Sequence, residues 1–188
     1  EVTIINKGIG GNTTRDALNR LSRDVLDLNP NITLIMFGLN DANRLSTEEY
    51  HNNLKEIVEK IKGKEIQPIV MTPNPATEKR KEVVGVEEYK KYVKKLETNV
   101  KNARKIAREA ETPLIDIYKF FKERPTLLKY IYDGIHPNIY AQAAMATYIS
   151  KNILEIIGAN KEFTYIDIES IECIHTDGKH NAFTDIIK

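Results

Sequence analysis

Short apolar runs alternate with longer amphipathic segments through the first 158 residues, and no other feature of the chain restricts its fold as strongly. The segment from Ile32 to Phe37 is an apolar run, as expected of a strand that is buried on both faces. Three further runs have the composition of short strands, at residues 2–6, 68–72 and 113–117. Strands that alternate with helices form a parallel sheet covered on both faces, so we expect a layered α/β domain.

The segments between these strands carry apolar residues at helical spacing. We predict helices at residues 14–28, 46–61, 87–111 and 138–157, with Gly158 after the last one. Thr13 or Thr14 is expected to cap the first helix, and Ser46 with Glu49 fits a capping box at the second. The charged stretch from Glu78 to Glu82 is predicted to be a solvated loop.

The pattern changes from about Asn160 onward. Strand-like segments follow at residues 163–168, 172–175 and 182–187, with a turn at 176–179 and no helical spacing between them. We therefore predict two units, an α/β domain over residues 1–158 and a short β-rich tail over residues 159–188 that begins a second, all-β domain.

The composition argues against several classes of partner. The chain has 28 basic and 27 acidic residues and no basic stripe, so nucleic acid is not an expected partner. No apolar run approaches the roughly 18 residues of a membrane-spanning helix, so no span is predicted. The single cysteine, Cys173, excludes an intramolecular disulfide. Neither the oligomeric state nor the cellular compartment follows from these features.

The segment from Asp133 to Pro137 carries the most specific chemical signal. An Asp and a His three residues apart on a turn punctuated by Gly and Pro can bond to each other. The carboxylate of Asp133 can then set the tautomer of the His136 imidazole, and the ring can act as a general base. Two of the three members of a Ser-His-Asp triad are thus predicted in one turn.

Two glycine-containing loops follow predicted strands. The loop at residues 8–14 lacks the glycine that a dinucleotide fingerprint needs at its sixth position, which is Thr13, and it lacks a P-loop Gly-Lys pair. It is either a turn that needs positive φ or a source of a backbone N–H for an oxyanion. The loop containing Asn40 is either a plain turn or a source of a side-chain donor for the same oxyanion, and Asp41 is interpreted as a turn former.

No metal or other cofactor is predicted. His51 lies in a predicted helix, away from the Asp133 turn. The group of Cys173, His175, Asp177 and His180 has a spacing that matches no common zinc motif. Because ligands of open parallel sheets bind at the carboxyl ends of the strands, the three loops that follow strands and the Asp133 turn are expected to converge there.

These motifs, in this order, make residues 1–158 resemble the SGNH (GDSL-like) hydrolase family. Residues 6–13 resemble its second conserved block, residues 38–41 its third and residues 133–137 its fifth. The resemblance implies a three-layer α/β/α sandwich with a flavodoxin-like parallel sheet and a serine esterase or acylhydrolase that needs no metal. It also implies that His136 is the base, that Asp133 orients it, and that Gly11 and Asn40 supply oxyanion-hole donors, with Gly10 as the alternative to Gly11.

The chain departs from the family at the block that carries the nucleophile. Gly-Asp-Ser after the first strand is absent, and that strand belongs between the predicted strands at residues 2–6 and 32–37. The serines present are poor substitutes because they lie within predicted helices, at a helix cap or in the tail: Ser22, Ser46, Ser150 and Ser170. Since the chain opens with Glu1 and not Met, we expect the strand and its serine to come from a segment upstream of this chain.

The tail suggests a substrate class. Residues 180–185 resemble the opening of some sialidase-like β-propeller domains, which implies a carbohydrate-active protein that deacylates O-acylated sugars. The expected partner is thus a small-molecule or carbohydrate ester. The alternative is a non-catalytic carbohydrate-binding relative on the same fold, which would keep the crevice and lack the nucleophile.

Overall fold

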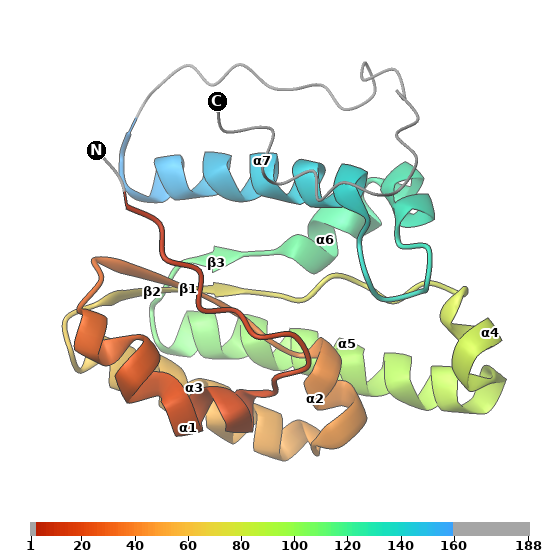
Figure 1. Ribbon diagram of the computed structural model, residues 1–188, viewed down its shortest axis with the longest axis horizontal. Coiled ribbons are helices and arrows are strands. Elements are labelled where there is room, and N and C mark those ends of the chain that lie inside the picture. The colour runs from red at the N-terminus through yellow and green to blue at the C-terminus, as the bar shows by residue number, and fades with distance from the viewer. Residues whose placement is uncertain (1–2, 160–188) are drawn as a thin grey trace.

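Three parallel strands form a sheet at the centre of the protein. The computed structural model describes residues 3–159, in which the strands are β1 (Ile32–Met36), β2 (Gln67–Met71) and β3 (Leu114–Ile115) (Figure 1). Their order in the sheet is β1-β2-β3. The register pairs Leu34 with Ile69 and Val70 with Leu114.

Helices connect and cover the strands. Their bounds are α1 (Thr14–Asp24), α2 (Leu39–Arg44), α3 (Thr47–Lys62), α4 (Arg80–Val84), α5 (Val86–Glu109), α6 (Ile117–Lys122) and α7 (Ile139–Ile156), with 3-10 turns η1 (Leu26–Leu28) and η2 (Pro125–Tyr130). Thr13 caps α1 and Ser46 caps α3, each accepting a backbone N–H in the first turn, as predicted. Gly158, with φ of 68°, follows α7 in the left-handed conformation.

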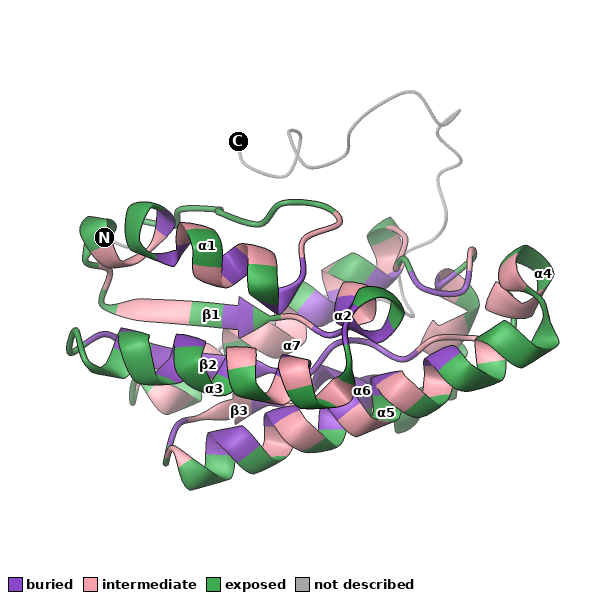
Figure 2. Cartoon of the chain, turned by 90° about the horizontal axis from the view of Figure 1, so that it is seen from below, coloured by how far each residue is buried: buried purple, intermediate pink, exposed green. Residues whose placement is uncertain are grey.

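The sheet is sandwiched between two helical layers. On one face α1, α3 and α5 pack around a core that includes Ile35 and Val70 (Figure 1). On the other face α6 and α7 pack around Ile69, Met71 and Ile115. Successive residues of β2 therefore point to opposite faces, and both faces are apolar, which is the pattern of a buried parallel strand. Figure 2 shows buried segments that alternate with intermediate and exposed ones along α3 and α5. The predicted three-layer α/β/α architecture is confirmed.

The prediction of a strand at residues 2–6 is wrong for the part that the structure describes, residues 3–6. These residues have no regular secondary structure, and Ile4 and Ile5 are 88% and 57% exposed. In the described part of the chain β1 pairs with β2 alone, so its outer edge is open. A β-branched segment without a neighbouring strand has no ladder of hydrogen bonds, which is why composition alone misassigned it.

Three local predictions are also corrected. The strand predicted at residues 113–117 stops at Ile115, because the Asp116 carboxylate accepts the N–H of Lys119 and starts α6 at Ile117. The predicted loop at residues 78–82 runs into helix α4, which starts at Arg80. The predicted loop after Gly38 contains helix α2.

One predicted helix boundary and one predicted capping interaction differ from the structure. Helix α1 ends at Asp24, and the chain continues through η1 to Asn29, whose φ of 45° breaks the helical path. The Glu49 side chain does not complete a capping box with Ser46, since it binds Arg15 of α1 at 2.7 Å. The first difference is local, whereas the second comes from a contact with another helix that a local pattern does not contain.

The strands predicted beyond Asn160 and the group around Cys173 lie outside the described residues. Among residues 3–159 no helix is both long and apolar enough to cross a membrane.

Candidate active site

Asp133 and His136 form a closed hydrogen-bonded turn. One oxygen of the Asp133 carboxylate, Oδ1, accepts the backbone N–H groups of Ile135 at 3.0 Å and His136 at 2.7 Å. The other, Oδ2, lies 2.5 Å from Nδ1 of the His136 ring. The His136 side chain is 70% exposed, against 30% for Asp133. With the Nδ1 proton directed to the carboxylate, the lone pair of Nε2 is left for another partner.

The Asp133 carboxylate is held in its ionised form. Partial burial by itself raises the pKa of this group, but the N–H groups of His136 and Ile135 and the His136 ring outweigh burial and lower the pKa to about 2. A permanent negative charge at Nδ1 favours the protonated imidazole that forms when Nε2 takes a proton.

The turn is braced by the loop that follows β2. Asn74 is 1% exposed, and its side-chain amide donates to the carbonyls of Ile135 at 3.0 Å and Pro75 at 3.1 Å. The N–H of Thr77 donates to the carbonyl of Gly134 at 2.9 Å. A buried amide that satisfies two carbonyls is costly to remove, so this loop fixes the backbone on which His136 stands.

Gly134 is expected to be indispensable for that packing. Its φ is +92°, and a Cβ at this position would lie 2.3 Å from the backbone nitrogen of Arg80. We expect Gly134→Ala to lower the free energy of unfolding by about 3 kcal/mol or more, since strain in φ adds to a clash with backbone. Urea unfolding of the complete protein measures this.

Gly85→Ala is the matched control for that substitution. Gly85 has φ of +81° and ψ of 162°, a conformation largely restricted to glycine, but a Cβ added there would have no other atom within 4 Å, so its loss should be limited to about 1–3 kcal/mol from backbone strain alone. Equal losses in the two variants would contradict the close approach of Arg80 to Gly134.

The Gly11 loop lies against the start of α2. Gly11 has φ of +82°, as the turn interpretation predicted, whereas Gly10 has no positive φ. The carbonyl of Gly11 accepts a hydrogen bond from the Arg44 guanidinium at 2.6 Å. Nδ2 of Asn40 donates to the carbonyl of Asn12 at 3.0 Å. An asparagine amide has two hydrogens, so this bond holds the side chain in place and leaves the second hydrogen for another acceptor.

The Asn40 region and the His136 turn meet in one apolar cluster. Ile135 packs with Ala42, Tyr92 and Leu96, and Leu39 lies against the same group. Leu39 and Ala42, which lie on either side of Asn40 in the sequence, thus share an apolar cluster with the residue before His136. The Gly11 loop is hydrogen-bonded to Asn40, and Asn40 and Asn74 follow β1 and β2 at the carboxyl ends of the strands, which is the end where ligands of open α/β sheets bind.

No serine in the described part of the chain is hydrogen-bonded to His136. Ser22 and Ser150 lie within α1 and α7, and Ser46 caps α3. Within residues 3–159 no group of three or more His, Cys, Asp or Glu side chains is arranged to hold a metal ion. Sequence reasoning missed the bracing role of Asn74, although a polar residue between two prolines after a strand is a usable signal of a constrained loop.

Comparison with known proteins places this chain in a family. The family model described as GDSL-like lipase/acylhydrolase matches residues 1–149. The chain is 27% identical over 164 residues to an acetylxylan esterase of Geobacillus stearothermophilus, a match that covers 77% of this chain and 69% of that protein.

A second relative and a solved structure are also similar. An uncharacterized lipoprotein, YqeF, of Bacillus subtilis (strain 168) is 43% identical over 82 residues, which are 40% of this chain and 34% of the lipoprotein. That match therefore spans about a third of the relative. The crystal structure of the lipase/acylhydrolase from Enterococcus faecalis has a TM-score of 0.67 and 26% identity, with 82% of this chain and 75% of that chain covered.

Proposed function

This chain belongs to the GDSL-like lipase/acylhydrolase family, and from that membership we propose that the complete protein is a serine ester hydrolase. The observation that carries the proposal is the contact of 2.5 Å between Asp133 and an exposed His136 ring. An ionised carboxylate on Nδ1 leaves Nε2 as the base, which is the arrangement that activates a serine hydroxyl.

The reaction has two acyl-transfer steps. Nε2 of His136 takes the proton from the serine hydroxyl as the serine oxygen attacks the ester carbonyl. The tetrahedral intermediate expels the alcohol, which receives that proton, and an acyl-serine remains. Water then attacks the acyl carbon and gives a proton to Nε2, and collapse of the second intermediate returns the proton to the serine and releases the acid.

The proposed oxyanion donors are the backbone N–H of Gly11 and the side chain of Asn40. Their support is the contact between the two loops, in which the Asn40 amide reaches the residue after Gly11 at 3.0 Å. Donors that are held in place before the reaction stabilise the developing charge without reorganisation.

The nucleophile is proposed to come from a segment upstream of this chain. The support is the open edge of β1. Leu34 is 42% and Met36 37% exposed there, although the apolar composition of this strand is typical of a strand in the interior of a sheet. A strand added there would pair with the free edge and cover these side chains. A serine at the carboxyl end of that strand would lie at the same end of the sheet as Asn40 and His136.

The proposed substrate class is the ester of an acylated carbohydrate. Its support is the similarity to an acetylxylan esterase, which covers 77% of this chain. Residues 1–158 would form the catalytic domain, and the tail would begin a second domain.

Labelling with a fluorophosphonate probe tests the proposal. Such probes react with an activated serine, so the protein expressed with its upstream segment should become labelled and should hydrolyse 4-nitrophenyl acetate and acetylated xylo-oligosaccharides. The chain of 188 residues alone should not be labelled. Labelling of the chain alone would contradict the proposed position of the nucleophile.

A carbohydrate-binding relative without activity gives a different result. It would bind the acetylated oligosaccharide in calorimetry, would leave the ester intact and would not react with the probe. That outcome would overturn the proposed function and favour the alternative.

A further inference from the structure

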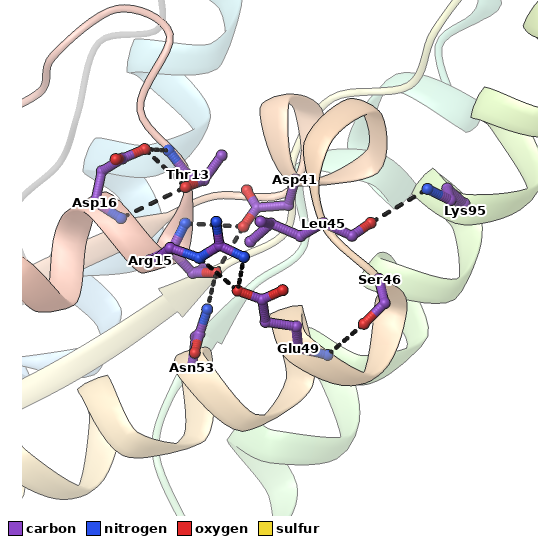
Figure 3. Close-up of polar contacts among 10 residues, drawn as sticks. Thr13, Arg15, Asp16, Asp41, Leu45, Ser46, Glu49, Asn53 and Lys95 are labelled. Atoms are coloured by element: carbon purple, nitrogen blue, oxygen red, sulfur yellow. Dashed lines mark hydrogen bonds and ion pairs between the residues drawn. The ribbon is translucent and has the colours of Figure 1, made fainter.

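Asp41 carries a buried carboxylate that joins two loops. It is 1% exposed, and its Oδ1 accepts the N–H of Thr14 at 2.8 Å and the Thr14 hydroxyl at 2.6 Å. Its Oδ2 accepts the N–H of Gly38 at 3.0 Å. Figure 3 shows the carboxylate directed at the start of α1, with Asn53 of α3 approaching the same point. Among the described residues no cation forms an ion pair with Asp41, so these three donors and its place in the first turn of α2 compensate its burial.

Local helix capping explains only part of this arrangement. The hydrogen bond from the Gly38 N–H to Asp41 caps the start of α2, and both residues belong to that end of the helix. The two bonds from Thr14 span 27 residues of sequence and contribute nothing to that cap. Burial of a carboxylate that links two segments costs free energy. A residue that only forms a turn would not need this burial.

The link lies next to both proposed oxyanion donors. Thr14 begins α1 just after the Gly11 loop, and Asp41 directly follows Asn40. A shift of α1 relative to α2 would therefore change the separation between the Gly11 N–H and the Asn40 amide. Donors of this kind act only when they lie about 2.7–3.1 Å from the position that the oxyanion will occupy.

We propose that Asp41 is a positioning residue that fixes the Gly11 N–H and the Asn40 side chain at the spacing that an oxyanion requires. It touches neither the substrate nor the reacting atoms and acts through Thr14 and Gly38. The proposal rests on the proposed function, because the two donors have a task only if the protein transfers acyl groups.

The test is the kinetics of Asp41→Asn in the protein that carries its upstream segment. An amide nitrogen cannot accept a hydrogen bond, so either Gly38 or Thr14 loses its acceptor and the two loops separate. We expect kcat for 4-nitrophenyl acetate to fall about 100-fold, as a displacement of about 1 Å can cause. KM should change little, and the acid limb of the pH profile should stay in place, because the Asp133–His136 pair is untouched.

Asp16→Asn is the matched control. Asp16 caps the same helix, accepting the N–H and hydroxyl of Thr13 at 2.8 and 2.7 Å (Figure 3). It makes no bond to the α2 segment among the described residues. This variant should lose stability through its weakened cap and keep its kcat. Equal kcat values in Asp41→Asn and Asp16→Asn would overturn the positioning role.

Substitutions of Thr14 keep the test decisive if Asp41→Asn does not fold. Thr14→Val removes the hydroxyl donor and should lower kcat at unchanged KM, whereas Thr14→Ser keeps the hydroxyl and should restore kcat to near the wild-type value. A Thr14→Val protein with wild-type kcat would contradict the proposal. An inactive wild-type protein would instead overturn the proposed function, and the positioning role with it.

Discussion

His136→Ala is expected to lower kcat of the protein with its upstream segment by about 10⁴- to 10⁶-fold on 4-nitrophenyl acetate. Without the imidazole no group in the described part of the site takes the proton of the serine hydroxyl, because the Asp133 carboxylate, whose pKa is lowered to about 2, is too weak a base. The activity that remains should reflect binding and the oxyanion donors alone. Because the His136 side chain is 70% exposed, the variant should unfold at nearly the same temperature as the wild type.

The control for His136→Ala is His51→Ala. His51 lies in α3, which does not contribute to the proposed site, so its replacement should leave kcat unchanged within about twofold. Turnover of the His136→Ala protein at the rate of the control would refute the assignment of the base.

The pH dependence of the wild type follows from the same pair. The pKa of Asp133 is lowered from its ordinary value of 3.8 to about 2. Because this shift favours the ionised form, its contribution to stability is complete above about pH 4 and is lost as the pH falls toward 2. A loss of kcat/KM that occurs above about pH 4 on the acid side therefore does not report protonation of Asp133.

The local motifs of the site were predictable from sequence because each is closed within a few residues. The bonds between Asp133 and His136 join residues three apart in the sequence. The positive φ of Gly11 is a property of one residue, and Thr13 caps α1 within one helical turn. Local hydrogen bonds and backbone preferences decide such features, and a sequence displays them directly.

The contacts between segments could not be predicted in the same way. Asp41 follows an Asn in a Gly-containing loop, which is the composition of an ordinary turn, yet its carboxylate binds a residue 27 positions away. Asn74 reaches Ile135 across 61 positions. A single sequence contains no measure of spatial proximity, so these roles became visible only in the folded chain.

The prediction of an N-terminal strand failed for a related reason. A β-branched run such as that at residues 3–6 has strand propensity, but propensity mostly measures how well side chains fit a half-buried pleated surface. In the described part of the chain no neighbour provides that surface, and Ile4 remains 88% exposed. The long helices were safer predictions, because α3 and α5 each bury an apolar stripe that runs over about three turns or more.

Asp133→Asn is expected to lower kcat at neutral pH by about 10³- to 10⁴-fold while leaving the turn folded. The amide oxygen of the new side chain can still accept the N–H groups of Ile135 and His136, which Asp133 Oδ1 accepts at 3.0 and 2.7 Å. Its NH₂ group, however, would face Nδ1 of His136, which lies 2.5 Å from Oδ2 in the wild type. A donor at that position favours the tautomer with the proton on Nε2, so the ring presents a donor where the serine needs an acceptor.

Comparison with Asp133→Ala separates this effect from loss of the turn. Alanine removes the acceptor for both backbone N–H groups as well as the partner of the ring, so it should lower the unfolding temperature, whereas asparagine should not. The two variants should nevertheless lose kcat to a similar extent, because both leave the imidazole without a negative charge on Nδ1. If Asp133→Asn retained more than about a tenth of wild-type kcat, the 2.5 Å contact would serve only to shape the turn, and His136 would act as a base without an orienting acid.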